Sequence, residues 1–170
     1  LPIHLVHGAL AQVVPERVGA ACCGTVMVAG FNGVDPRTGE TWIYLETIGG
    51  GGGARAGKDG LDGVHVHMTN TSNLPVEALE IEYPLTVLRY ELADGSAGPG
   101  RQRGGMGLRR VYRAEADCRI EIDTSRLRSA PWGLAGGGAA APSRLVFAPG
   151  APPLAAGSGT LAAGATLAIV

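Results

Sequence analysis

The chain has 170 residues, of which 45% are hydrophobic and 17% are charged, and its formal net charge at pH 7 is −1. This length suits one ordinary folded domain with its own core. The charge balance excludes both a disordered acidic tail and a strongly basic nucleic-acid-binding module.

The N-terminal part of the chain is predicted to contain a short helix and two strands. Residues 7–18 show helical spacing of apolar side chains, although Pro15 opposes a regular helix there. Strands are expected at 24–31 and 41–48, with turn residues at 32–39 between them. The second strand is therefore expected to return alongside the first.

A third strand-like segment follows a glycine-rich loop. Residues 64–68 alternate, which places the valines on one face and His65 and His67 on the other. A break at 73–75 then precedes a possible helical turn through Glu80.

The C-terminal part is predicted to consist of strands and glycine-rich connections. Strands are expected at 84–92, 108–114, 118–123, 143–148 and 160–170. The second and third of these are expected to form a hairpin. The sequence thus predicts a mainly β fold, or an α+β fold with little helix, in which short antiparallel strands are joined by glycine-rich loops.

The three cysteines and the absence of sorting signals point to one location. The number of cysteines is odd, and two of them, Cys22 and Cys23, are adjacent, whereas Cys118 stands alone. This pattern does not suit a disulfide framework and favours free thiols in a reducing compartment. No stretch is apolar enough to cross a bilayer, and no secretory signal is visible. A cytoplasmic protein with no membrane partner is expected.

The most unusual feature is a run of five glycines, namely Gly49, Gly50, Gly51, Gly52 and Gly53. Their bare backbone N–H groups can form an anion-binding concavity. A nucleotide-binding P-loop is excluded because Lys58 is followed by Asp59 and Gly60, and a Rossmann loop would need a helix next. The loop is therefore expected to bind an anion or to pack closely against other polypeptide.

Histidines and short polar residues follow that loop. His65 and His67 could share a metal, but further ligands are not evident, so hydrogen-bonded histidines are favoured and no metal ligand is assigned. Thr69, Asn70 and Asn73 belong to a polar string that either satisfies local backbone groups or orients a polar substrate.

Arginines dominate the next glycine-rich connection. Arg101 and Arg103, with Arg109, Arg110 and Arg113 close by, could bind phosphate or nucleic acid. Aromatic residues are sparse among them, so a solvated loop or a protein interface is favoured and no nucleic-acid partner is expected.

A series of ordered blocks carries a resemblance to a known family. The blocks are 46–55, 59–64, 67–71, 75–77, 82–85, 89–92 and 98–107, with a weaker one at 131–134. Together they resemble the C-terminal part of the hydantoinase B/oxoprolinase family. Members usually have several hundred residues before this region and a glycine-rich segment after it.

This resemblance implies that residues 1–170 are a single β-rich domain or fragment, the C-terminal portion of a B-type subunit. Both ends of the sequence lie in apolar segments, which fits the same expectation. The N-terminal portion and extreme C-terminus of that subunit would be absent, and the fragment alone is expected to be inactive.

The family resemblance also implies an activity. Such systems open cyclic amides such as hydantoins or 5-oxoproline at the expense of ATP. An A-type actin-like ATPase subunit or domain phosphorylates the substrate carbonyl, and the B-type part promotes attack by water. The resemblance implies ATP and a divalent metal for the full complex, but neither is expected to bind to this fragment alone. The metal ligands of the family would lie mainly in the absent N-terminal portion of the B-type subunit.

No catalytic residue is assigned from the sequence. The candidates for substrate binding are Arg55, His67, Thr69, Asn70, Asn73, Arg101 and Arg103, together with the glycine loop. A fragment of an ATP-dependent ketone carboxylase, or a non-catalytic β-rich assembly module, is the alternative.

Overall fold

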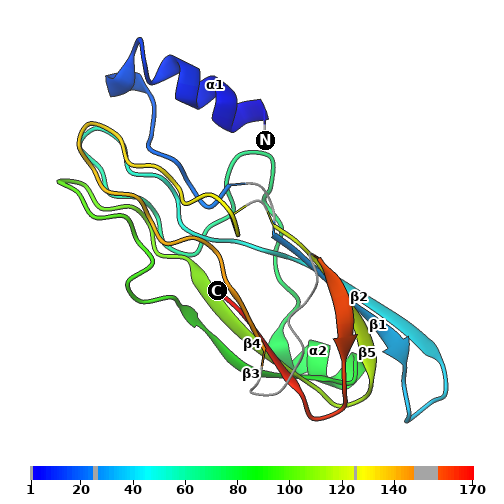
Figure 1. Ribbon diagram of the computed structural model, residues 1–170. Helices are drawn as coiled ribbons and strands as arrows, with labels where there is room; N and C mark the ends of the chain where they lie inside the picture. The colour runs from blue at the N-terminus through cyan, green and yellow to red at the C-terminus, as the bar shows by residue number, and fades with distance from the viewer. Residues whose placement is uncertain (1, 25–26, 125, 148–156) are drawn as a thin grey trace.

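The computed structural model describes residues 2–24, 27–124, 126–147 and 157–170. Two four-stranded antiparallel sheets pack against each other, and loops gather at one end of them (Figure 1). The helical elements are α1 (Pro2–Leu10), a 3-10 turn at Pro15–Arg17 and α2 (Val76–Glu82). The predicted mainly β class is confirmed. Within the described residues, no helix has the length and apolar composition needed to cross a membrane.

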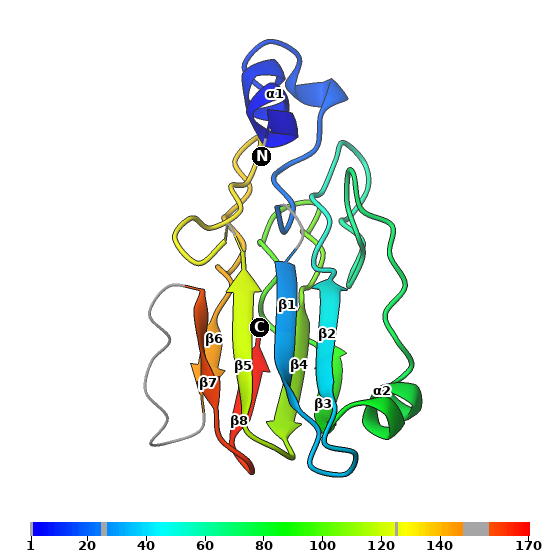
Figure 2. The same ribbon diagram turned by 90° about the vertical axis from the view of Figure 1, so that its right-hand side faces the viewer.

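The first sheet has the order β2-β1-β5-β7 and the second has the order β3-β4-β8-β6. The strands of the first sheet are β1 (Met27–Val34), β2 (Thr41–Ile48), β5 (Cys118–Asp123) and β7 (Ser158–Leu161). Those of the second are β3 (Leu85–Leu92), β4 (Leu108–Ala114), β6 (Leu145–Phe147) and β8 (Thr166–Ile169). Figure 2 shows the two layers one behind the other.

The core lies between the sheets and follows from the alternation along each strand. In β5, buried Cys118, Ile120 and Ile122 alternate with exposed polar residues, as expected for a sheet with one wet face. The ring of Phe31 in the first sheet packs 4.9 Å from that of Tyr112 in the second. Aromatic contacts of this kind join the two layers.

The β1–β2 hairpin is confirmed, but its turn is shorter than predicted. Asn32 and Gly33 pair within β1, and the chain turns at 35–39. Gly33 is needed for a different reason, because a Cβ there would lie 2.9 Å from the carbonyl oxygen of Asp117. The glycine therefore allows a neighbouring segment to approach the strand.

The hairpin predicted from β4 and β5 is wrong. Both strands have the predicted bounds, yet β4 belongs to the second sheet and β5 to the first, so residues 115–117 cross between layers. The segment 160–170 is likewise two strands, β7 and β8, in opposite sheets. Strand periodicity is a local signal, whereas the choice of partner depends on which layer buries the apolar face.

Two further expectations are corrected near the loops. The predicted helix at 7–18 lies earlier, at α1, and only a 3-10 turn forms beside Pro15, whose missing N–H disfavours a continuous helix. The predicted strand at 64–68 does not form: Val64 makes one isolated bridge to Gly50, and His67 has φ +59°, which breaks an extended chain.

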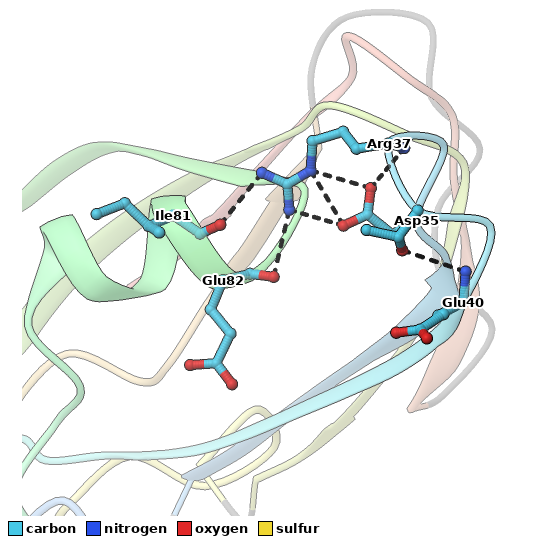
Figure 3. A network of polar contacts seen from close by, with 6 residues as sticks. Asp35, Arg37, Glu40, Ile81 and Glu82 are labelled. Atoms are coloured by element: carbon cyan, nitrogen blue, oxygen red, sulfur yellow. Dashed lines mark hydrogen bonds and ion pairs between the residues drawn. The ribbon is translucent and has the colours of Figure 1, made fainter.

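An arginine joins the β1–β2 turn to the end of α2 (Figure 3). The guanidinium of Arg37 donates to both carboxylate oxygens of Asp35, at 3.0 and 2.7 Å. It also donates to the carbonyls of Ile81 and Glu82, each at 3.2 Å. These carbonyls end the helix without partners inside it, so Arg37 caps α2 and fixes it against the sheet.

Candidate functional site

A cavity of about 860 Å³ lies among the loops at one end of the sandwich. Its walls come mainly from residues 20–23, 48–52, 54–57, 93–102, 104–109 and 131–144. Figures 1 and 2 both show these loops gathered between the strands and α1. The volume falls within the range of about 300–1,000 Å³ that is typical of ligand pockets.

The glycine run packs against other loops of the same chain. The N–H of Gly52 donates to the carbonyl of Leu61, and the N–H of Gly105 donates to the carbonyl of Gly52, both at 2.8 Å. A Cβ on Gly105 would lie 1.9 Å from the carbonyl oxygen of Leu61, and one on Gly51 would lie 2.0 Å from that of Gly105. Only glycine lets main chains approach this closely.

This close packing lies within the chain, so it differs from the packing against other polypeptide that the sequence suggested. The N–H groups of Gly50 and Gly52 are already engaged, by the carbonyls of Val64 and Leu61. They are therefore not free to bind an anion. Residues 49–52 line the cavity, so this part of its wall is main chain without side chains.

The cavity carries an excess of positive charge. Among the described side chains, five arginines and two acidic residues line it, namely Arg55, Arg101, Arg109, Arg126 and Arg144 with Glu16 and Asp94. Arg109 is paired with Glu91 at 3.1 Å, and Arg126 donates to the carbonyl of Cys22 at 3.1 Å. Among the described residues, the exposed side chains of Arg55 and Arg101 have no hydrogen-bond or ion-pair partner. Their charge is available to a ligand.

Arg103 lies apart from this cavity lining, although the sequence grouped it with Arg101. Its guanidinium forms a two-pronged ion pair with Asp62, at 2.7 and 2.9 Å. Asp62 also accepts from the N–H of Met106 at 2.7 Å. Arg103 therefore joins two loops and holds the cavity in shape.

Two of the three candidate residues in the polar string, Thr69 and Asn73, are hydrogen-bonded within the chain. Thr69 donates to the carbonyl of Val66 at 3.0 Å, and Asn73 donates to the carbonyl of Thr47 at 2.8 Å. Asn73 also accepts from the hydroxyl of Tyr90. Asn70 is exposed, and none of the three lines the cavity. Thr69 thus satisfies a local backbone group, whereas Asn73 joins β2 to β3.

The side chain of His67 contacts the thiol of Cys22 and not the side chain of His65, with which it was expected to share a strand face. Its Nε2 lies 3.2 Å from Sγ of Cys22, which also lies 3.6 Å from Nε2 of His4. The side chain of Cys23 hydrogen-bonds Cys22 and, with these imidazoles, lowers the pKa of the Cys22 thiol. Cys22 is buried and lines the cavity. The sequence could not indicate this cluster because its members are far apart along the chain.

The structure also contains a buried ion pair that the sequence does not predict. Arg110 was grouped with solvated arginines, but its side chain is fully buried between the sheets, 2.5 Å from a carboxylate oxygen of Glu46. The hydroxyl of Tyr112 donates to the same oxygen at 2.7 Å. A signal existed: Arg110 alternates with Tyr112 and Ala114 on the inward face of β4.

The Asp62–Arg103 pair predicts acid sensitivity of the loops. Arg103 and the N–H of Met106 lower the pKa of Asp62 from 3.8 to about 2. A lowered carboxyl pKa stabilises the fold above the unfolded value, and that contribution is lost as the pH falls from 3.8 towards 2. We expect Asp62→Asn to lower the urea midpoint at pH 7 and to differ much less from the parent chain at pH 2, where Asp62 of the parent is about half protonated.

The matched control for that measurement is Asp123→Asn, on the exposed face of β5. Its urea midpoint should equal that of the parent chain at both pH values. An Asp62→Asn chain that differs from the parent equally at pH 7 and pH 2 would show that the pair does not titrate as described.

Comparison with known proteins identifies the family. The family model for hydantoinase B/oxoprolinase matches residues 2–169. The B-type subunit of a putative D-/L-hydantoinase from Pseudomonas sp. (strain NS671) is 42% identical over 74% of the chain, which spans only 21% of that relative. The crystal structure of an ATP-dependent caprolactamase from Pseudomonas jessenii has a TM-score of 0.67 at 24% identity, over 95% of this chain and 30% of that one.

A nucleotide-free acetone carboxylase structure gives a TM-score of 0.65 at 19% identity, over 94% of this chain and 26% of that one. At these identities the two solved structures show a shared fold and no more. The family model extends over almost every residue, and it agrees with the ordered sequence blocks. The chain belongs to the hydantoinase B/oxoprolinase family.

Proposed function

We propose that this chain is part of an ATP-dependent cyclic-amide hydrolase that opens hydantoin or 5-oxoproline rings. Its contribution is a wall of the substrate cavity and a contact surface for other subunits. The observation that carries the proposal is the cationic, glycine-lined cavity within a member of this family. The 42% identical relative, whose name is that of a hydantoinase, supports the choice of reaction.

In this proposal the free guanidinium groups bind negative charge on the reacting molecule. Arg55 and Arg101 lie at the cavity with no competing carboxylate partner among the described residues. Arginine binds carboxylate and phosphate oxygens through paired, charge-assisted hydrogen bonds. The two side chains would hold a substrate carboxylate or a phosphorylated carbonyl while water attacks. The glycine wall leaves room for a ring because no side chain projects from it.

The remaining parts of the catalytic system belong to other polypeptide in this proposal. An A-type actin-like ATPase would bind ATP and activate the carbonyl, and the rest of the B-type subunit would hold the divalent metal of the family. The three free thiols suit the reducing cytoplasm.

Alanine substitutions in the assembled enzyme test the role of the two arginines. We expect Arg55→Ala and Arg101→Ala each to lower kcat/KM for ring opening by about 10- to 100-fold, the loss expected for a charge-assisted hydrogen bond. Arg119→Ala is the matched control, because Arg119 is exposed on the outer face of β5. Both cavity variants turning over at the parent rate, with the subunits still assembled, would refute the proposal.

The same enzyme preparation separates the alternative activity. A ketone carboxylase would consume bicarbonate with acetone or acetophenone and would not open a cyclic amide. The likeness to acetone carboxylase concerns the fold, whereas an amide hydrolase subunit is similar in sequence. We therefore favour hydrolysis, and turnover that requires bicarbonate would reverse that choice.

A further inference from the structure

Imidazole and thiol groups gather where α1 meets the loops. Three of the four histidines of the chain lie together, namely His4 and His7 on α1 and His67 on the loop after β2. Cys22 approaches from a third segment, 18 residues from His4 and 45 from His67. Such a concentration of metal-ligating side chains, drawn from three segments, has no role in the core packing of the sandwich.

The spacing of the donor atoms suits a single metal ion. Sγ of Cys22 lies 3.2 Å from Nε2 of His67 and 3.6 Å from Nε2 of His4. The ligand atoms of the three residues all lie within 4.8 Å of one another. Zinc bonds of about 2.3 Å to sulfur and about 2.0–2.1 Å to nitrogen separate tetrahedral ligands by about 3.5 Å. Small ring rotations would bring all three atoms onto one ion.

The backbone of His67 supports a binding role. His67 has φ +59°, a left-handed conformation that is uncommon for a residue with a side chain. This conformation belongs to a turn in which the N–H of Thr69 donates to the carbonyl of Val66 at 3.3 Å, and it leaves the imidazole exposed. The rings of His4 and His7 both lie edge-on to the His67 ring, at 4.8 and 5.3 Å between centroids. These contacts hold the imidazole towards Cys22.

We propose that His4, Cys22 and His67 bind a Zn²⁺ ion. One thiolate and two imidazoles form a donor set that zinc accepts, whereas Mg²⁺ and Ca²⁺ prefer oxygen. Three protein ligands leave one coordination position for water or another molecule. Because Cys22 also lines the cavity, the ion lies at the cavity wall and ties α1 to the loops. This assignment does not depend on the reaction proposed above.

Cobalt substitution tests the site without any assay of activity. The full chain, reduced and stripped of metal with a chelator, is titrated with Co²⁺. We expect one equivalent to produce the intense visible absorption of tetrahedral Co²⁺ and a near-ultraviolet thiolate charge-transfer band. Both signals should disappear when Zn²⁺ is added, since zinc binds such sites more tightly than cobalt.

Matched variants assign the ligands. Cys22→Ser should abolish the charge-transfer band, and His67→Ala should weaken binding by more than about 100-fold, the upper end of the loss caused by changing a residue that only orients a ligand. Cys23→Ser and His65→Ala, each near a proposed ligand but outside the set, should leave both signals in place. Because His67 is exposed, its replacement leaves the core packing intact.

Two outcomes would overturn the assignment. One is a parent chain whose Co²⁺ spectrum remains that of the hydrated, octahedral ion. The other is a charge-transfer band that survives Cys22→Ser or is lost in Cys23→Ser. Either result would leave the cluster as a thiol–imidazole contact.

Discussion

Arg110→Met should destabilise the fold by about 3–5 kcal/mol, the loss typical when one partner of a buried ion pair is removed. The substitution leaves the Glu46 carboxylate buried between the sheets without a cation. It also removes the guanidinium that lies 4.6 Å from the ring centroid of Tyr90 and 5.2 Å from that of Tyr112. Urea unfolding followed by tryptophan fluorescence measures the difference in the free energy of unfolding.

A second substitution identifies the cause of this loss. Adding Glu46→Gln to Arg110→Met removes the unpaired charge, while the new amide oxygen can still accept from the Tyr112 hydroxyl. The double variant should therefore recover much of the lost stability, since a neutral buried group costs less than a charged one. If the double variant is as unstable as Arg110→Met, lost packing rather than the buried charge is responsible.

Gly105→Ala should cost about 3 kcal/mol, at the upper end of the range for overpacking, and should disturb the cavity. The added Cβ would lie 1.9 Å from the carbonyl oxygen of Leu61 and 2.8 Å from the nitrogen of Gly52. Both neighbours are main chain, so relief requires two loops to separate and their hydrogen bonds to break. The free energy of unfolding and the hydrogen-exchange protection of residues 50–64 should both fall.

Gly107→Ala is the control for that substitution. Gly107 lies two residues away in the same connection, and a Cβ there would meet only the Ser96 hydroxyl at 3.6 Å, an ordinary contact. Its stability should stay within about 1 kcal/mol of the parent value. Equal losses in the two variants would mean that loop flexibility, and not close approach of main chains, explains the need for glycine at Gly105.

Strand positions could be predicted from the sequence where a strand has one buried face. In β2 and β5 the alternation of buried and exposed residues is complete enough to give the bounds correctly. The same alternation does not indicate which strands pair with each other. The prediction that β4 and β5 pair therefore depended only on the short connection between them. Their connection, 115–117, resembles a hairpin turn, and only the burial of both apolar faces between layers sends them to opposite sheets.

The candidate site was predictable in part. The run of five glycines is unusual in composition, and Arg101 belongs to a recognisable arginine–glycine cluster. Residues 49–52 of the run and Arg101 line the cavity in the structure. The cluster of Cys22, His4 and His67 has no spacing that a motif could capture. Arg110 shows a different limit: its alternation with Tyr112 and Ala114 indicates the inward face of β4, but the partner that permits its burial, Glu46, lies far away along the chain.

The sequence by itself determined the mainly β class, the bounds of β2, β4 and β5 and the family, because these depend on periodicity and on ordered motifs along the chain. The tertiary structure alone decided the layer that each strand joins, the burial of the Glu46–Arg110 pair and the meeting of Cys22 with His67. These features depend on contacts between distant segments, whose free energy arises only when the whole apolar surface is buried at once.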